Sequence, residues 1–140
     1  GGTVIKNGQP AFMAYGGADS TASGNYLIIN TEVFDIRGDY NPSTGVFTAP
    51  TVGRYIFTLT GLYTKNTATP NFKLAWHVNN SNSGVAAEWQ DGSISNSYNT
   101  IGNSSIIFNL AANDTVRLYV EASTFHISGI QTRFCGYLLG

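Results

Sequence analysis

Few residues in this chain of 140 have the chemistry of a catalytic or metal site. The reactive side chains are two histidines, His77 and His126, and one cysteine, Cys135. Two imidazoles and one thiol do not complete the four-ligand set of a structural zinc site within one chain. The GxSxG, HExxH, Walker A, CxxC and EF-hand motifs are all absent from the sequence. We therefore expect a protein that is not an enzyme.

The spacing of the titratable residues gives the same expectation. Glu88 and Asp91 are three apart in an expected strand, so alternation places them on opposite sides rather than as a glycosidase acid–base pair. His77 is expected on the solvent side of its strand, and no partner can be identified for His126. Cys135 lies in an apolar strand and is expected to be a buried structural thiol.

The aromatic residues divide into core candidates and one binding candidate. Trp76 alternates with Leu74 and Val78, which predicts packing in the core rather than stacking on a sugar. Trp89 also falls in an apolar alternation. Tyr98 lies in a polar stretch, where it is either an exposed stacking ring or a ring packed over a loop, and the sequence leaves both open.

Composition restricts the class of protein. A chain that is 42% hydrophobic and 13% aromatic is enough for one domain with a single core. Charged residues make up only 11%, and the net charge is −1. With no basic face to hold a phosphate backbone, nucleic acid is excluded as a partner. No apolar run reaches the length that a membrane span needs, so we expect no membrane insertion.

Turn signals rich in Gly, Asn, Ser and Pro recur about every 8–15 residues, with β-branched and aromatic residues between them. This spacing predicts an all-β fold. The expected strands are 10–16, 26–30, 32–37, 45–48, 54–64, 71–79, 85–91, 104–111, 115–122 and 130–139.

Alternation in three of these strands predicts apolar side chains on both faces of a sheet. An antiparallel sheet with a second apolar face needs a partner to cover that face. The residues expected on the second, non-core face are Ile56, Leu62, Tyr119, Tyr137 and Leu139.

Residues 38–57 carry the most specific local pattern, in which an Asn-Pro turn and two glycine corners separate alternating aromatics. Pro42 excludes a helix, and Gly45 and Gly53 permit positive φ. We expect two strands joined by a bend, with Gly53 at a corner that enters a central strand.

That stretch resembles the signature of the globular head of complement C1q, in the form YN..TG.FTAP..G.Y.F. Three further matches bracket it, namely Pro10-Ala11-Phe12, the NDTVRL run at 113–118 and the FCGYLL run at 134–139. The resemblance extends over residues 10 to 139.

The resemblance implies a ten-stranded jelly roll of two five-stranded antiparallel sheets over residues 10–140, assembled as a homotrimer. Residues 1–9 are expected to be the remnant of a longer, stalk-bearing protein. The implied function is non-enzymatic trimerisation and ligand recognition at the end of a fibrous or collagen-like protein. The charge-poor surface favours a phage fibre or bacterial surface protein, located extracellularly, on a cell or on a virion.

The ligand is expected to be a cell-surface glycan or protein, bound by loops that offer amides, hydroxyls and little charge. The longest polar stretches include 79–84 and 92–103. The recognition residues predicted in them are Asn80, Asn82, Tyr98 and Asn99.

Calcium is the one cofactor that the sequence leaves open. It needs six to eight oxygen ligands, which the Asp91 carboxylate can supply only when a threefold axis presents it three times. Calcium-binding members of the resembled family have two acidic positions near that axis. Asp91 falls near the first, but Asn99-Thr100 stands in the region of the second.

Two other classes remain open. A monomeric jelly-roll carbohydrate-binding module would present aromatics such as Tyr98 along an exposed groove. A jelly-roll glycan hydrolase would carry a pair of carboxylates from different strands in a cleft.

Overall fold

A computed structural model describes residues 8–18, 20–65, 71–90, 98–127 and 129–140. These residues form twelve strands and one short 3-10 helix, η1 (Gly129–Gln131). The strands are β1 (Ala11–Tyr15), β2 (Ser20–Ala22), β3 (Thr31–Asp35), β4 (Tyr40–Asn41), β5 (Val46–Thr48), β6 (Gly53–Lys65), β7 (Asn71–Val78), β8 (Ser81–Gln90), β9 (Tyr98–Leu110), β10 (Thr115–Ala122), β11 (Thr124–Ile127) and β12 (Arg133–Leu138).

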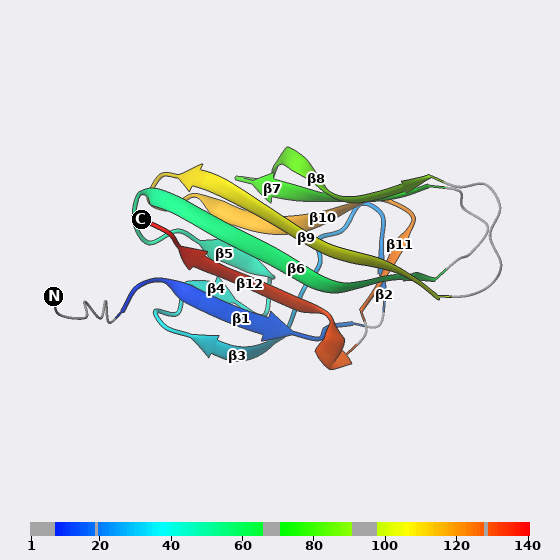
Figure 1. Ribbon diagram of the computed structural model, residues 1–140, viewed down its shortest axis with the longest axis horizontal. Coiled ribbons are helices and arrows are strands. Elements are labelled where there is room, and N and C mark those ends of the chain that lie inside the picture. The colour runs from blue at the N-terminus through cyan, green and yellow to red at the C-terminus, as the bar shows by residue number, and fades with distance from the viewer. Residues whose placement is uncertain (1–7, 19, 66–70, 91–97, 128) are drawn as a thin grey trace, which may run out of the picture.

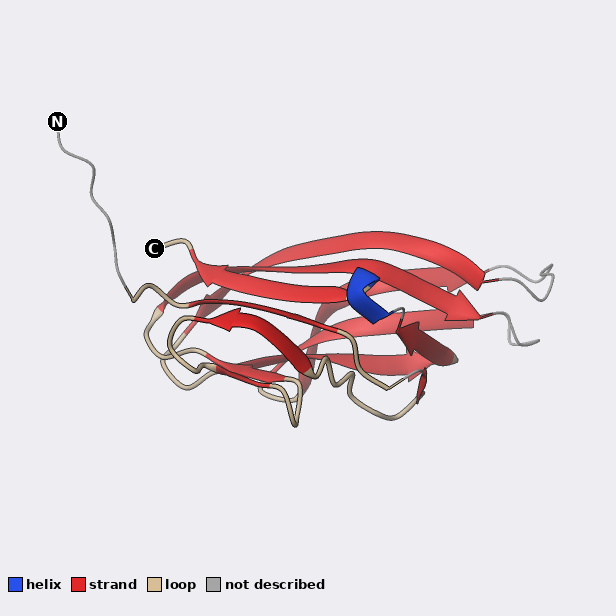
Figure 2. Cartoon of the chain, turned by 90° about the horizontal axis from the view of Figure 1, so that it is seen from below, coloured by secondary structure: helices blue, strands red, loops and turns tan. Residues whose placement is uncertain are grey.

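The strands make two antiparallel sheets that pack face to face. One sheet has the order β2-β11-β6-β12-β1-β3 with β9 on the other side of β6, and the second has the order β4-β5-β10-β7-β8. Figure 1 shows β9, β6, β12, β1 and β3 lying side by side, and Figure 2 shows the two sheets as stacked layers. The predicted all-β sandwich of two antiparallel sheets is confirmed.

The strand count differs from the expected two sets of five. The short strands β2, β4 and β11 were not predicted, because runs of two to four residues carry too little alternation to be seen in sequence. Residues 26–30, expected as a strand, hold only a single bridge between Tyr26 and Tyr119. That segment is still bound along β10, since Leu27 N–H donates to the Leu118 carbonyl at 2.8 Å.

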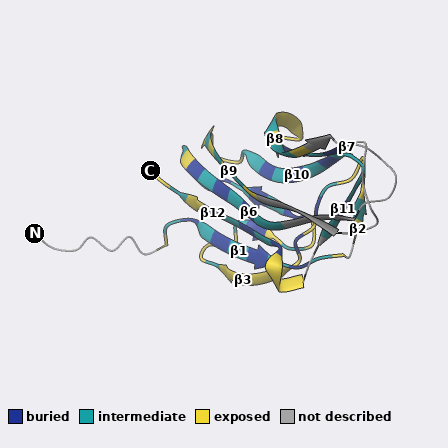
Figure 3. Cartoon of the chain, turned by 45° about the vertical axis from the view of Figure 1, so that its right-hand side comes forward, coloured by how far each residue is buried: buried dark blue, intermediate teal, exposed yellow. Residues whose placement is uncertain are grey.

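The core lies between the sheets and is dominated by aromatic rings. Phe12 stacks on Tyr40 with ring centroids 4.6 Å apart and meets Phe134 edge-on at 5.0 Å. Trp76 is fully buried, as its alternation predicted, and its indole Nε1–H donates to Ser104 Oγ at 3.3 Å. Figure 3 shows the resulting alternation of buried and less buried positions along β6. The Trp89 side chain lies outside the described part of the chain.

The segment that carries the sequence signature forms β4, β5, the turn between them and the start of β6. Gly45 has φ 74°, and a Cβ at this position would lie 2.3 Å from the Leu27 carbonyl oxygen. Tyr40 enters the core and its hydroxyl donates to the Ile29 carbonyl. The expectation of a positive φ at Gly53 is wrong. Its constraint is steric, since a Cβ there would lie 2.6 Å from Leu138 Cδ1.

The residues just before β1 are hydrogen-bonded to the end of β12. The Leu138 N–H donates to the Pro10 carbonyl at 3.0 Å, and the Gln9 side-chain amide donates to the Leu138 carbonyl. Within the described ranges there is no helix of the length and apolar character that a membrane-spanning helix requires.

Candidate functional site

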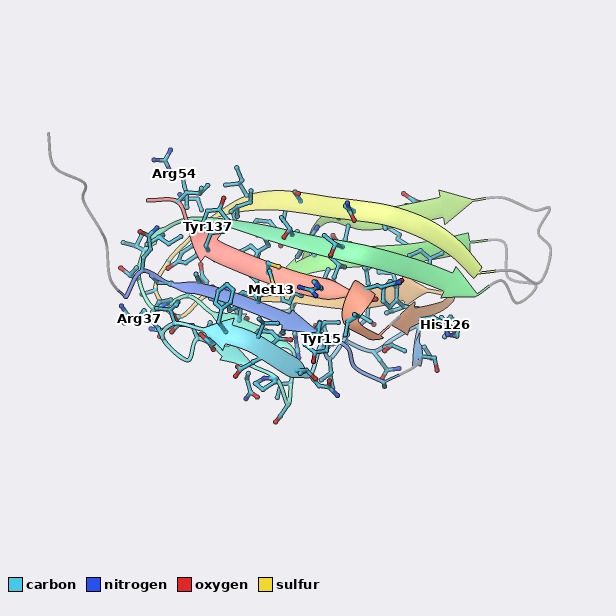
Figure 4. The ribbon with its side chains drawn as sticks, turned by 60° about the horizontal axis from the view of Figure 1, so that its bottom comes forward. Met13, Tyr15, Arg37, Arg54, His126 and Tyr137 are labelled. Atoms are coloured by element: carbon cyan, nitrogen blue, oxygen red, sulfur yellow. The ribbon has the colours of Figure 1, made fainter. Side chains whose placement is uncertain are left out.

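The outward side of the larger sheet carries an apolar row that crosses four adjacent strands. Strand register places Ala11 opposite Tyr137, Tyr137 opposite Ile56, and Ile56 opposite Ile107. The side chains of Ile107 and Tyr137 are 56% and 48% exposed. In Figure 4, which looks onto this sheet, Met13 and Tyr137 lie on β1 and β12. We call this row and the next one the assembly face.

The next row of the assembly face mixes apolar and small polar groups. Phe34 lies opposite Met13, Met13 opposite Cys135, and Cys135 opposite Thr58. Phe34 is 42% exposed although β3 is the edge strand beside β1. Cys135 is only partly buried rather than fully buried as expected, and burial raises the pKa of its thiol. An exposed, partly apolar sheet surface of this kind is typical of a protein–protein contact.

The five predicted interface residues do not share one surface. Ile56 and Tyr137 lie together on the assembly face, and Leu139 follows β12 with 47% of its surface exposed. Tyr119 belongs to β10 of the other sheet, so the expectation that it joins them is wrong. Alternation reports the two faces of a single strand and does not show that β10 and β12 belong to different layers.

The assignment of Leu62 to the trimer interface stays a prediction. The register of β6 shifts between Leu59 and Leu62, and Gly61 has φ 67°. A bulge of this kind interrupts the alternation from which the face of Leu62 was inferred. Its side chain lies outside the described part of the chain.

The outward side of the smaller sheet carries a compact group of Tyr26, His77, Asn80, Arg117 and Tyr119, here called the tyrosine–arginine cluster. The Arg117 guanidinium carbon lies 3.3 Å from the centre of the Tyr26 ring. Arg117 Nε–H and Nη2–H donate to Asn80 Oδ1 at 3.0 and 2.7 Å. The Tyr119 ring stacks on the His77 ring at 4.7 Å, and the Tyr26 hydroxyl bonds His77 Nδ1 at 3.1 Å.

Strand pairing explains how residues 37 and 51 positions apart meet here. Arg117 lies opposite His77, and His77 opposite Asn82, while Tyr26 bridges to Tyr119 from the far side of β10. The β7–β8 hairpin is closed by two residues with positive φ, Asn79 and Asn80. Two successive residues in that region form the type I′ turn, for which Asn is favoured.

Further polar contacts lie next to the tyrosine–arginine cluster on the same sheet. Glu121 Oε2 lies 3.1 Å from Lys73 Nζ, and Glu121 Oε1 accepts a hydrogen bond from the Asn82 amide. The nearby Asp114 carboxylate accepts from Asn79 Nδ2 at 2.9 Å, and this bond contributes most to lowering the pKa of Asp114.

His77 is not the surface residue that alternation predicted. It is only 7% exposed, because the Tyr26 and Tyr119 rings cover it. Its Nε2 is buried and has no hydrogen-bond partner among the described residues. Burial lowers the pKa of the imidazole, and the charge of Arg117 acts in the same direction, while Glu121 opposes them.

The predicted recognition residues separate into two groups. Asn80 and Asn82 lie side by side in the β7–β8 hairpin, and both amides are used to hold Arg117 and Glu121. Tyr98 and Asn99 belong to β9 rather than to a loop, and their side chains lie outside the described part of the chain. Asp91, the predicted calcium ligand, also lies outside the described residues.

A family model for the C1q domain matches residues 11–139, almost the whole of the chain. The chain is a member of the C1q domain family. No curated protein sequence gives a significant match.

Solved structures of C1q and TNF type share the fold of this C1q domain. The globular domain of zebrafish complement 1qA superposes with a TM-score of 0.70 and 14% identity, covering 94% of this chain and 98% of that one. Eiger TNF from S. frugiperda gives a TM-score of 0.71 and 13% identity, covering 94% and 93%. Murine APRIL gives 0.65 and 10%, covering 94% and 99%. These likenesses confirm the predicted jelly roll.

Sequence reasoning about this C1q domain missed the tyrosine–arginine cluster as a unit. Alternation puts Tyr119 on the outward side of its strand, and polarity picks out Asn80, but nothing in sequence connects them to Tyr26. The only available signal was the two-residue Asn79-Asn80 turn, which fixes the β7–β8 register and so brings Asn80 towards β10.

Acid pH is expected to destabilise the C1q domain through His77. Its pKa in the folded chain lies below the ordinary value of 6.5, so the unfolded chain binds the proton more readily. The contribution of the neutral ring is therefore fully present above pH 6.5 and is lost as the pH falls through the folded value. The melting temperature should fall further between pH 7 and pH 5 for the parent chain than for His77→Gln. An equal fall in both would show that His77 is not the group responsible.

Proposed function

We propose that this C1q domain is a non-enzymatic, homotrimeric recognition head, in keeping with C1q-type domains, which are typically trimeric and extracellular. The observation that carries the proposal is the assembly face, where Tyr137, Ile56 and Ile107 form a continuous apolar row across three strands. A row of this kind on a sheet that already has a full core on its other side needs a partner surface. Two further copies of the same chain around a threefold axis would provide it.

Recognition is assigned to the tyrosine–arginine cluster, which lies on the sheet opposite the assembly face. A trimer built on the larger sheet would leave the smaller sheet of each copy free to meet a cell-surface glycan or protein. Three such sites on one rigid head would act together, so that weak single contacts give strong attachment. The setting that we propose is the tip of a fibre on a virion or a bacterial surface.

The two alternatives are less well supported. A hydrolase would need a carboxylate pair available to substrate, whereas both oxygens of Glu121 are engaged by Lys73 and Asn82. A monomeric carbohydrate-binding module would leave the assembly face uncovered.

Attachment strength should separate the trimer from a monomer. The parent chain and an assembly-face variant, Ile107→Glu, would be compared for binding to one immobilised glycan or cell surface. We expect dissociation to be slower for the parent chain by about 100-fold, which is within the gain that multivalency gives. Val52→Glu, in the connection between β5 and β6 and also exposed, provides the matched control. Equal dissociation rates for parent and Ile107→Glu would contradict the proposal.

A further inference from the structure

Arg117 is held in place by neutral groups alone. Asn80 Oδ1 accepts two of its N–H groups, and the Tyr26 ring lies 3.3 Å beneath the guanidinium carbon. Within the described ranges no carboxylate lies at salt-bridge distance from Arg117, unlike Arg37 and Lys73. A guanidinium fixed in this way keeps its full charge and has already lost the side-chain freedom that binding would otherwise cost.

The charges around Arg117 leave one positive charge without a partner. The Lys73 ammonium and the Glu121 carboxylate are paired with each other at 3.1 Å. His77 is held neutral by burial, which lowers its pKa. Arg117 is therefore the one charged member of the tyrosine–arginine cluster, and it has no salt bridge to a described residue. A complementary ligand for this position carries an anionic group.

Tyr119 lies beside Arg117 on the same side of β10, two residues further along the strand. Side chains at this spacing stand about 7 Å apart, which is close enough for one sugar ring and its carboxylate to contact both. The Tyr119 ring is partly exposed and packed on His77, which holds it in place. The amphipathic rings of tyrosine suit contact with the C–H face of a sugar, and a planar carboxylate suits the guanidinium fork.

The state of His77 is a second, independent observation that points to a binding site on this surface. Its side chain is more than nine-tenths buried, and its Nε2 has no partner among the described residues. Leaving a polar atom in this state is costly, and such positions tend to occur at functional sites. The buried Nε2 is therefore an observation, independent of Arg117, that marks this surface as a candidate binding site.

We propose that the tyrosine–arginine cluster binds an acidic saccharide, with the Arg117 guanidinium on the sugar carboxylate and the Tyr119 ring against the sugar ring. Asn80 is a positioning residue, which orients the guanidinium without touching the ligand. This inference rests on the proposal that the domain is a recognition head, and it names the ligand class of that head.

The test uses the whole chain and two trisaccharides that differ only in their terminal sugar, glucuronic acid in one and glucose in the other. Calorimetric titration should show the acidic trisaccharide bound at least about tenfold more tightly, the value expected for one charged hydrogen-bonding pair. Arg117→Gln should abolish this difference, and Arg117→Lys should retain only part of it, because lysine lacks the planar fork. The matched control is Arg54→Gln, an exposed arginine on the other sheet.

Two substitutions at Asn80 test the positioning role. Asn80→Gly keeps the positive φ of 63° accessible and removes only the amide, so the preference for the acidic sugar should weaken. Asn80→Asp places a carboxylate on Arg117 and should abolish the preference through competition inside the protein. Melting temperatures of both variants would show whether the fold is retained. A merely structural role for Asn80 predicts equal preference in both.

Several results would overturn the inference. Equal affinity for the two trisaccharides, or a preference that survives Arg117→Gln, removes Arg117 as the recognition group. Tighter binding of a short peptide with a terminal glutamate than of the acidic trisaccharide removes the saccharide as the ligand class. A trimer that attaches to a glycan surface equally well with Arg117→Gln contradicts this inference and leaves the proposed function standing. A monomeric parent chain contradicts the proposed function instead.

Discussion

Gly61→Ala is expected to destabilise the folded chain by about 2 to 6 kcal/mol, from backbone strain and overpacking of about 1 to 3 kcal/mol each. Gly61 has φ 67°, and a Cβ at this position would lie 1.9 Å from the Gln131 carbonyl oxygen. The buried Thr132 hydroxyl donates to the Gly61 carbonyl at 2.7 Å, so the backbone has little freedom to move away. A loss of this size is a large part of the about 5 to 15 kcal/mol that usually stabilises a small domain.

The position matters because β6 changes partners there. Its first half pairs with β12 up to Thr60, and its second half pairs with β11 from Leu62. Gly24→Ala is the matched control, since Gly24 also has a positive φ, 86°, but a Cβ there would have nothing within 4 Å. That variant should lose only about 1 to 2 kcal/mol. Chemical denaturation would measure the free energy of unfolding of both variants. Equal losses of stability would show that crowding at Gly61 is not the cause of the destabilisation.

Ile107→Glu and Tyr137→Glu are each expected to convert the trimer into folded monomers at micromolar concentration. Ile107 and Tyr137 lie at two positions of the apolar row, and both are about half exposed in a single chain. The monomer therefore tolerates a carboxylate at either position. In the trimer three carboxylates would lose their hydration without a basic partner, which is strongly unfavourable.

Light scattering and circular dichroism would measure the mass and the fold of the two variants. Val52→Glu should remain trimeric, because Val52 lies in the connection between β5 and β6, outside the assembly face, and is 71% exposed. Loss of β-sheet signal in Ile107→Glu would show a folding defect rather than dissociation, and Tyr137→Glu then decides the outcome. Trimeric variants with intact fold would place the interface elsewhere.

The parts of the fold that follow alternation could be predicted from sequence. Phe72, Leu74 and Trp76 in β7, and Val116, Leu118 and Val120 in β10, are all buried as their period of two requires. This pattern is local, since each strand reports on its own two faces. It does not report which strands share a sheet, and for that reason Tyr119 was grouped with Ile56 across two different layers.

The candidate site was predictable only in pieces. The polarity of Asn80 and Asn82 picks them out, but in the fold their exposed amides are hydrogen-bonded to Arg117 and Glu121. His77 has the alternation of a surface residue and is buried because Tyr26, 51 residues away, lies across it. Contacts of this kind depend on tertiary packing, which no local pattern contains.

The central claim is that the assembly face joins three copies of the chain. Sedimentation equilibrium of the whole chain at micromolar concentration measures this directly. The account predicts a single species with a mass close to three times the 15.0 kDa of one chain. A single species with the mass of one chain, unchanged up to the highest concentration reached, would contradict it.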